Sequence, residues 1–443
     1  MSHALRIVIF ISSRYTMYRY HRFSYRNRAA AGEQGERLIH GKGGPSMEAF
    51  EKRQKAGIRY DLDRMRKVLE LLGNPQNTGK AVHIAGTNGK GSTAAYMEAL
   101  LKETCTTWTF ISPSFSGREE QFRWCGRAPD EETFARWVDE VLPAVEETEK
   151  QFGMMTPFEL TTTVFYYAAR EKQPDVLIVE AGMGGKLDAT NVIEHPSAAV
   201  ITSIGSDHLT YLGGSRETAA RHKAGIFREG VPAICSADQE ALVWLKEEAE
   251  SAGAVWTPPV SWEWEAPDRL TIDGESVTLP ASGRHQASNA ALAYTACIHT
   301  GSIAAPKHLS KAVLPGRSEE VLPGVTLDTA HNPEAVNAVT SALPQHPDRL
   351  ILFACMKDKD AAGMIAMLES CGKLTAASWP SPRAQTCSEW KDMFPDLPCT
   401  DDPVQWVKTY AGKRPLLILG SHDFASFLRP KLIEMRNNGA GKE

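Results

Sequence analysis

The sequence predicts an α/β fold in two domains, each built on a mainly parallel sheet. Residues 81–102 have the pattern of a strand, a glycine-rich turn and a helix. Two continuously apolar segments, 176–181 and 198–204, are typical of parallel strands that helices cover on both faces. After about residue 300 the alternation of strand-like and helical segments restarts. A chain of 443 residues is long enough for two such domains and an appendage.

The composition is ordinary for a water-soluble enzyme with a sizeable core, with 42% hydrophobic and 23% charged residues. No apolar run approaches the roughly 20 residues that cross a bilayer, so we expect no membrane partner. The eight cysteines are scattered and show no metal-type spacing. We therefore expect them to be small buried hydrophobic residues in the cytoplasm, a reducing compartment.

The first 46 residues differ from the rest in charge. They hold eight Lys/Arg against two Asp/Glu, a balance of +6. Because the whole chain has a net charge of −5, the remaining residues carry −11, which argues against general nucleic-acid binding. An Arg-containing leader with few acids is typical of an organelle transit peptide. The alternative, which we favour, is an upstream extension with Met47 as the natural start. Either way we exclude residues 1–46 from the fold and expect disorder.

The glycine-rich turn is the strongest chemical signal in the chain. Glycines let backbone N–H groups converge on phosphate oxygens at the start of a helix, where the helix dipole adds positive potential. Lys90 can reach terminal phosphates, and a hydroxyl of Ser92 or Thr93 can ligate Mg²⁺. An ordinary glycine-rich turn is the alternative, and ATP binding is our prediction. The predicted phosphate loop consists of Gly86, Thr87, Asn88, Gly89, Lys90, Gly91 and Ser92.

Helices are predicted around this unit from apolar spacing and end signals. Residues 62–72 carry apolar side chains at helical spacing and stop at Gly73-Asn74-Pro75. Further helices are expected at 130–150, 157–169, 216–227 and 284–296. Glu159 lies in the first turn of one of them, where the helix dipole favours a carboxylate. By itself Glu159 is therefore interpreted as a capping residue.

Polar residues stand where the buried strands end. Glu180 closes the strand at 176–180, and a carboxylate at that end of a parallel strand faces the ligand crevice. It is a plausible Walker-B-like residue. His208 comes just past the next strand, where a histidine is as often a ligand as a structural residue. Residues 236–283 are predicted to form a small β excursion around Asp273-Gly274, without chemistry.

The second domain is predicted from four strand-like segments at 325–328, 350–353, 376–378 and 416–419. It has no phosphate loop of its own. Its polar residues Arg317, Asp328, His331 and Asn332 gather near its start and at one strand end. We therefore assign 47–299 to an ATP-binding domain and 300–443 to a smaller Rossmann-like domain that closes over it.

Seven blocks of the sequence resemble motifs of the Mur ligase superfamily and, within it, of the folylpolyglutamate synthase/dihydrofolate synthase family. They spread over most of residues 47–430, so that chance agreement is negligible. In order they are G-T-N-G-K-G-S at 86–92, E-A-G-M-G-G-K-L-D-A-T-N at 180–191, I-T-S-I-G-S-D-H at 201–208, H-K-A-G-I at 222–226, L-P-G-R at 314–317, D-T-A-H-N-P at 328–333 and K-D-K-D at 357–360.

The resemblance implies an ATP and metal site. ATP would lie on residues 86–92, and Asn289, Arg317 and Asp328 would complete its site across the interdomain cleft. The family's Mg²⁺ ligands match Ser112, Glu159 and His208, and oxygen ligands with retained waters suit Mg²⁺. Lys223 matches a lysine that is carbamoylated in the family, which would make it a ligand for a second Mg²⁺.

The resemblance also implies substrates and a reaction. ATP would phosphorylate a carboxylate to an acyl phosphate, which the α-amino group of L-glutamate then attacks. His331 would lie near the amino acid, and Gly57, Ile58 and Arg59 are candidates for pterin contact. The family is usually monomeric. The expected catalytic residues are Lys90, Glu159, His208, Lys223 and His331.

Departures from the family motifs leave the acceptor open between dihydropteroate, reduced folates or both. Ser112-Pro113-Ser114-Phe115 replaces the usual S-P-H-L, and Lys186, His222 and Ser318 replace Arg, Glu and Phe. Two other functions remain as alternatives. One is a Mur-type ligase for a non-folate carboxylate such as a peptidoglycan precursor, and the other is a nucleotide-binding protein without ligase activity.

Overall fold

The computed structural model describes residues 45–56, 61–344 and 346–440. By its internal contacts the chain divides between Gly43 and Gly44, and residues 1–44 of the predicted extension lie outside the described part. The described residues form sheets of seven, three and six strands. Among the helices of this part, none is both long and apolar enough to span a membrane.

The seven-stranded sheet is parallel except at one edge, as the apolar segments predict. β1 lies at its centre and pairs in parallel with β4 on one side and β5 on the other. At the edge, β3 pairs antiparallel with β2. In spatial order the strands are β3 (Phe122–Trp124), β2 (Thr107–Phe110), β4 (Val176–Glu180), β1 (Lys80–Ala85), β5 (Ala198–Ile201), β6 (Pro232–Cys235) and β7 (Val255–Thr257).

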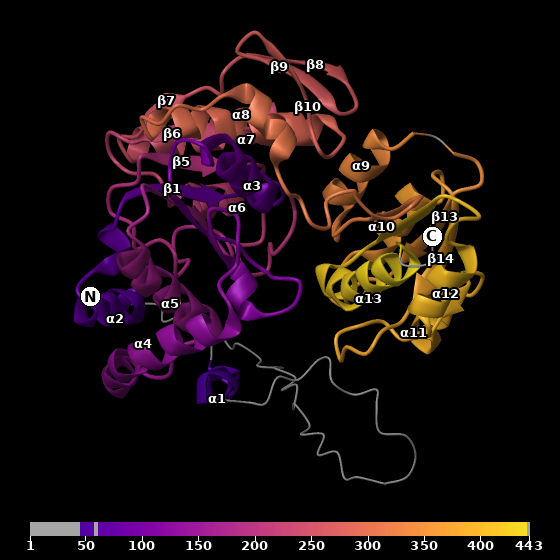
Figure 1. Ribbon diagram of the computed structural model, residues 1–443, viewed down its shortest axis with the longest axis horizontal. Helices are drawn as coiled ribbons and strands as arrows, with labels where there is room; N and C mark the ends of the chain where they lie inside the picture. The colour runs from indigo at the N-terminus through magenta and orange to yellow at the C-terminus, as the bar shows by residue number, and fades with distance from the viewer. Residues whose placement is uncertain (1–44, 57–60, 345, 441–443) are drawn as a thin grey trace, which may run out of the picture. The chain divides into compact units, whose positions relative to one another are not determined.

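Helices cover both faces of this sheet. Val176 and Ile178 of β4 pack in one buried cluster with α3 and α8, whereas Leu177 and Val179 pack in another with α2, α4 and α5. The course of these helices can be followed in Figure 1. This alternation confirms that the continuously apolar segments are buried strands. The helices are α1 (Pro45–Arg53), α2 (Asp63–Leu71), α3 (Lys90–Leu101), α4 (Glu131–Phe152), α5 (Pro157–Lys172), α6 (Arg216–Ala224), α7 (Gln239–Ser251) and α8 (Arg284–His299), with 3₁₀ turns η1 (Pro75–Asn77), η2 (Arg118–Gln121) and η3 (Pro306–Lys311).

The helices predicted from spacing and end signals correspond to α2, α4, α5, α6 and α8. The Asp130 side chain caps α4 by accepting the Thr133 N–H at 2.7 Å. At the start of α5, Thr156 and Glu159 form a reciprocal capping box, which confirms the capping interpretation of Glu159. Residues 236–283 also contain α7 and β7, which the sequence pattern did not predict, and α1 was likewise not predicted.

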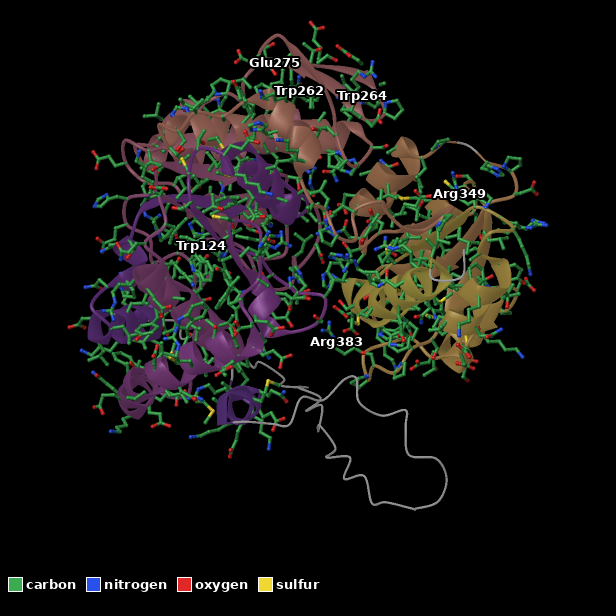
Figure 2. The ribbon with its side chains drawn as sticks, in the orientation of Figure 1. Trp124, Trp262, Trp264, Glu275, Arg349 and Arg383 are labelled. Carbon is green, nitrogen blue, oxygen red and sulfur yellow. A yellow bond between two sulfur atoms is a disulfide. The ribbon has the colours of Figure 1, made fainter. Side chains whose placement is uncertain are left out.

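The predicted β excursion is a three-stranded antiparallel sheet of β8 (Trp262–Ala266), β9 (Arg269–Ile272) and β10 (Glu275–Thr278). Asp273 and Gly274 have φ angles of 51° and 77°, as a two-residue hairpin turn with right-handed strand twist requires. Leu270 and Val277 point into the core beside α8. Figure 2 labels Trp262, Trp264 and Glu275 on this sheet.

The six-stranded sheet contains the four segments predicted in the second half of the chain, as β12, β13, β14 and β16, together with β11 and β15. Buried clusters lie on both of its faces. The domain boundary at residue 300 stays a prediction. In spatial order the strands are β11 (Glu319–Leu322), β12 (Val325–Leu327), β16 (Leu416–Leu419), β13 (Leu350–Phe353), β14 (Lys373–Ala377) and β15 (Cys399–Thr400), and the helices are α9 (Pro333–Ala342), α10 (Ala361–Leu368), α11 (Cys387–Met393), α12 (Pro403–Tyr410) and α13 (His422–Ala440).

Two cysteines correct the expectation that all are unpaired. Cys387 and Cys399 form a disulfide between α11 and β15. Their Cα atoms lie 5.6 Å apart, within the usual range for such a bond, because α11 begins beside the edge strand. Sequence spacing could not reveal this pair, since twelve residues and a helix separate the two thiols. Of the six other cysteines, four are buried, as expected.

Candidate functional site

The predicted phosphate loop lies between β1 and α3 at the carboxyl edge of the first sheet. Gly89 is the residue before α3, with a φ angle of 92°. A Cβ at this position would lie 2.4 Å from Oδ1 of Asn289, so the loop passes α8 too closely for any larger residue. The amino end of α3 therefore faces the space above the sheet, where its dipole attracts anions.

Residues that follow β5 hold this loop in place. The hydroxyls of Thr202 and Ser203 donate hydrogen bonds to the carbonyl of Asn88 at 2.6 and 2.9 Å. Oγ1 of Thr87 accepts the N–H of Gly205 at 2.9 Å. The loop conformation is thus fixed by a neighbouring strand end before any ligand binds.

Lys90 folds back over the loop toward a buried carboxylate. Its Nζ donates to the carbonyls of Gly86 and Thr87 at 3.1 and 3.3 Å and lies 3.9 Å from Oε1 of Glu180. Burial raises the pKa of Glu180, and the charges of Lys90 and Arg317 oppose that rise. Glu180 is therefore a buried carboxylate beside the phosphate loop, as its position at the end of β4 suggested.

Two hydroxyls in the first turn of α3 are available for a ligand. Ser92 Oγ and Thr93 Oγ1 are buried and have no hydrogen-bond partner among the described residues. In the described part of the chain, no three His, Cys, Asp or Glu side chains are grouped to hold a metal. A metal here would depend on hydroxyl and carboxylate oxygens together with phosphate oxygens. Such a ligand set fits Mg²⁺, which keeps several waters beside a triphosphate.

One cavity of about 570 Å³ brings together almost all of the predicted site residues. Its walls come from the carboxyl edges of both large sheets and from α8. The predicted residues that line it are Gly86, Thr87, Asn88, Gly89, Lys90, Gly91, Ser92, Ser112, His208, Lys223, Asn289, Arg317, Asp328 and His331.

Glu159 lies elsewhere, in a second cavity of about 560 Å³. Its carboxylate accepts hydrogen bonds from Nε of Arg64 at 3.0 Å and from the Thr156 N–H at 2.7 Å. These contacts occupy its oxygens, so the geometry favours Glu180 as the carboxylate at the phosphate loop. A metal role for Glu159 stays a prediction.

The two cavities adjoin, since Ser112, Pro113, Gly182 and Met183 line both of them. The residues predicted to contact a pterin, Gly57, Ile58 and Arg59, lie outside the described residues.

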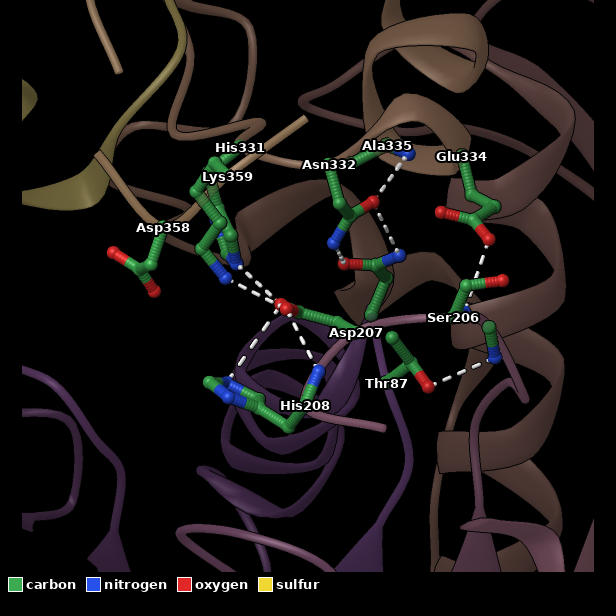
Figure 3. Close-up of polar contacts among 12 residues, drawn as sticks. Thr87, Ser206, Asp207, His208, His331, Asn332, Glu334, Ala335, Asp358 and Lys359 are labelled. Carbon is green, nitrogen blue, oxygen red and sulfur yellow. Dashed lines mark hydrogen bonds and ion pairs between the residues drawn. The ribbon is translucent and has the colours of Figure 1, made fainter. Parts of the chain in front are cut away.

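Asp207 joins the two halves of the first cavity. Its carboxylate accepts a hydrogen bond from Nζ of Lys359 at 2.6 Å and lies 3.2 Å from Nε2 of His331 (Figure 3). Both partners belong to the part of the chain after residue 300 that builds the six-stranded sheet, here called the second sheet's half. Burial alone would raise the pKa of Asp207, but the hydrogen bonds from His331 and Lys359 hold it well below its usual value. Asp207 is therefore a fixed negative charge that bridges Lys359 and His331.

A second set of contacts fastens the start of α9 to the phosphate loop. The side-chain amides of Asn88 and Asn332 exchange hydrogen bonds at 3.1 and 3.2 Å. Glu334 accepts the N–H of Ser206 at 3.0 Å (Figure 3). Asn332 also caps α9 by accepting the Ala335 N–H at 2.8 Å. The helix that follows His331 is thereby held in register with the loop.

Lys223 is buried on α6 and lines the first cavity. Burial lowers its pKa to about 8, and the charge of Lys90 adds to this effect. A lysine with such a pKa is partly neutral near neutral pH. His208 has a φ angle of 58°, and its side chain is 46% exposed to solvent. Burial lowers the pKa of His208, and the charge of Asp207 opposes this lowering.

Asp328 supports the turn that carries Arg317. Its carboxylate accepts the N–H groups of Ser318 and Ala330 at 2.6 and 2.7 Å. Nη2 of Arg317 lies 4.0 Å from the place that a Cβ at Gly91 would take, next to the phosphate loop. The structure thus brings Arg317 from the second half of the chain to the amino end of α3.

The sequence prediction omitted three polar residues of this site. Asp207 and Lys359 stand in the I-T-S-I-G-S-D-H and K-D-K-D blocks but were given no role. Glu334, two positions after Asn332, was not predicted either. A charged residue one position from a predicted ligand, as Asp207 is from His208, was the available signal. The ion pair of Asp207 with Lys359, which are 152 positions apart, could not be derived from the sequence.

Comparisons with known proteins agree with this geometry. The Mur ligase middle domain model matches residues 84–297. The dihydrofolate synthase/folylpolyglutamate synthase of Bacillus subtilis is 34% identical over 424 residues, which cover 86% of this chain and 96% of that protein. The structure of E. coli FolC in complex with DHPP and ADP is similar, with a TM-score of 0.79, 27% identity, and coverage of 88% and 97%. A bifunctional folylpolyglutamate synthase/dihydrofolate synthase with Mn, AMPPNP and L-glutamate bound has a TM-score of 0.76, 25% identity, and coverage of 88% and 98%.

Replacing Asp207 with Asn should destabilise the protein markedly. The substitution leaves Lys359, whose side chain is only 12% exposed, without its anionic partner, so urea unfolding at pH 7 should show a loss of about 3 kcal/mol. Because the folded pKa of Asp207 is depressed, its contribution is present above the unfolded pKa and disappears as the pH falls through the folded pKa.

Asp358→Asn is the matched control for this change. Asp358 pairs with Arg383 at 3.2 Å, but both side chains are more than half exposed, so its loss should cost less than about 1 kcal/mol. Equal losses in the two variants would contradict the role given to Asp207.

Proposed function

We propose that this chain, which belongs to the dihydrofolate synthase/folylpolyglutamate synthase family, is an ATP-dependent ligase that joins L-glutamate to a folate-type carboxylate. The observation that carries the proposal is the first cavity. It combines a phosphate loop with Arg317, His331 and Lys359 from the second sheet's half, and it opens onto a second cavity through Ser112. A nucleotide, an acceptor and an anionic amino acid thus each find matching chemistry in one connected space.

The nucleotide belongs on the phosphate loop. The N–H groups at the start of α3 and the ammonium of Lys90 suit the phosphates, and Arg317 approaches from the other side. Asn289 and Asp328 line the same cavity and would complete the site. Ser92 and Glu180 are suited to hold Mg²⁺, which would neutralise charge on the transferring phosphoryl group. Ser112 and His208 are further candidate ligands.

The second cavity suits the acceptor. Leu62, Phe158 and Leu187 provide apolar walls. Its border at Ser112 and Gly182 leads to the phosphate loop, so a flat ring system could lie in the second cavity while its carboxylate enters the first. The DHPP and ADP bound by the similar E. coli protein support this assignment.

The amino acid belongs near the second sheet. His331, Lys359 and Arg383 line this part of the first cavity, and their N–H groups are donors that suit the carboxylates of a dicarboxylate amino acid. The L-glutamate bound by a similar bifunctional enzyme supports this choice of amino acid.

The reaction needs two displacements. An acceptor carboxylate oxygen attacks the γ-phosphorus of ATP, which forms an acyl phosphate and releases ADP. Lys90 and Arg317 offset the negative charge at this phosphorus. The neutral α-amino group of glutamate then attacks the acyl carbon, the amide forms, phosphate leaves and the nitrogen loses a proton. The contacts of Asp207, Asn88 and Asn332 hold the two sides of the cavity together, which would limit the access of water to the acyl phosphate.

Lys223 has properties that suit carbamoylation. Its neutral amine, favoured by a pKa near 8, would add to CO₂ and release one proton, which leaves a carbamate anion in place of an ammonium. Such an anion could serve a second Mg²⁺ in the same cavity, as the family resemblance implies. Lys223 would then turn from a source of repulsion toward Lys90 into an attractive partner.

Two other functions are less well supported. A Mur-type ligase for a non-folate carboxylate shares the phosphate loop, but the similarity to the B. subtilis protein spans 96% of that relative. A nucleotide-binding protein without activity need not keep Lys90, Glu180, Lys223 and Arg317 around one cavity. That the protein acts as a cytoplasmic monomer, without nucleic-acid or membrane partners, stays a prediction.

The product mass after incubation with Mg-ATP and L-glutamate tests the proposal. One arm contains 7,8-dihydropteroate and the other tetrahydrofolate, and at least one should gain glutamyl units. Lys90→Ala removes the cation beside the phosphates and should reduce the rate by at least about 100-fold. Absence of product in both arms while ATP still binds would contradict a folate-type acceptor. Full activity of Lys90→Ala would contradict the mechanism.

Carbamoylation of Lys223 predicts a carbon resonance from labelled bicarbonate. Protein equilibrated with ¹³C-bicarbonate near pH 8 should give one carbamate signal in its NMR spectrum. Lys223→Arg should lose the signal, because a guanidinium stays protonated and does not add to CO₂. The signal should weaken as the pH falls below the pKa of Lys223, since the neutral amine is then scarce. A signal that survives in Lys223→Arg would contradict this site.

A further inference from the structure

Phe115 crosses from the loop after β2 to the second sheet's half. Its ring lies 4.7 Å from the ring of His422, measured between centroids, and the guanidinium of Arg429 lies 5.2 Å from its centroid. The ring packs against the buried cluster between the second sheet and α13, although its own loop lines the cavities beside the first sheet. This aromatic side chain therefore joins two parts of the chain that are more than 300 residues apart.

The loop that carries Phe115 is rigidly held. The carboxylate of Glu120 accepts the N–H groups of Phe115 and Ser116 at 3.2 and 3.0 Å and the hydroxyl of Ser116 at 2.5 Å. Three residues before Phe115, Ser112 lines both cavities, and its backbone N–H faces Glu180. A shift of the Phe115 ring is thus transmitted to the border between the cavities.

The other side of Phe115 touches the turn that carries Arg317. A Cβ at Gly316, where φ is 62°, would lie 2.5 Å from Cζ of Phe115, so the ring and the turn fit closely. Arg429, which lies over the ring, binds Glu319 through two hydrogen bonds of 2.7 and 2.8 Å. Glu319 in turn accepts the Gly316 N–H at 2.8 Å. Ring, ion pair and turn form one packed unit next to Arg317.

We propose that Phe115 is a positioning residue for Arg317. Phe115 belongs to the loop at the border between the two cavities and packs against the Gly316–Arg317 turn, and this contact fixes Arg317 over the phosphate loop. This inference rests on the proposed function, in which ATP occupies the first cavity and the acceptor the second. Phe115 touches neither reacting group. It acts by setting where the Arg317 guanidinium lies, and thereby couples ATP use to an acceptor held beside Ser112.

The proposal predicts a specific defect in Phe115→Ala. Misplacing a phosphate-binding cation should lower kcat/KM for Mg-ATP by about tenfold or more. More phosphate should also be released per glutamate added, because a loosened border admits water. Phe115→Leu should recover most of the activity, because leucine fills much of the same apolar space. Leucine is also the usual residue of the family motif at this position.

Phe427→Ala is the matched control. Phe427 is a half-buried aromatic residue in the same cluster, and the ammonium of Lys431 lies 3.8 Å from its ring centroid. A structural role alone would lower the melting temperature in both Ala variants and leave kcat/KM unchanged at a temperature well below both transitions. The same kinetic and coupling values in the two variants would overturn the proposal.

A double-mutant cycle with Arg317→Ala tests the route of the effect. If Phe115 acts through Arg317, adding Phe115→Ala to Arg317→Ala should change kcat/KM by less than about twofold. An undiminished effect would overturn the proposal. If the wild-type protein ligates no glutamate, the proposed function fails, and the same cycle is measured on the dissociation constant of Mg-ATP. There too, a Phe115→Ala effect that persists without Arg317 would contradict the inference.

Discussion

The charge of Asp207, held between Lys359 and His331 with 11% of its side chain exposed, is the interaction on which the site depends. The phosphate loop belongs to one sheet and Arg317 to the half of the chain that builds the other, so neither alone forms a site. Asp207 joins the two halves with bonds of 2.6 and 3.2 Å, and the paired amides of Asn88 and Asn332 add a second connection. Because a buried carboxylate is costly without partners, these contacts favour one arrangement of the two sheets.

The chemistry follows from what each half contributes. The first sheet supplies backbone N–H groups, Lys90 and the buried Glu180 at the edge where its parallel strands end. The second half supplies Arg317 and Lys359, whose long side chains line the same cavity. An acyl phosphate survives only where water is excluded, so a site divided between two halves allows substrates to enter and then removes them from solvent.

Much of this could be predicted from the sequence. The parallel sheets follow from apolar segments such as β4, and the phosphate loop follows from glycines between a strand and a helix. Contacts between distant segments could not be derived in this way. Glu159 illustrates the limit, since its sequence position could not show that its oxygens bind Arg64 and Thr156. The disulfide of Cys387 with Cys399 and the packing contacts of Phe115 likewise depend on tertiary structure alone.

In the proposed mechanism the two adjoining cavities form one reaction space, in which an acceptor carboxylate in one reaches the γ-phosphate in the other. The most direct test follows oxygen from the acceptor. With both oxygens of the acceptor carboxylate labelled by ¹⁸O, each phosphate released during ligation should carry one labelled oxygen, because that oxygen joins phosphorus in the acyl phosphate. Phosphate without label would mean that phosphoryl transfer goes to water, and it would contradict the account.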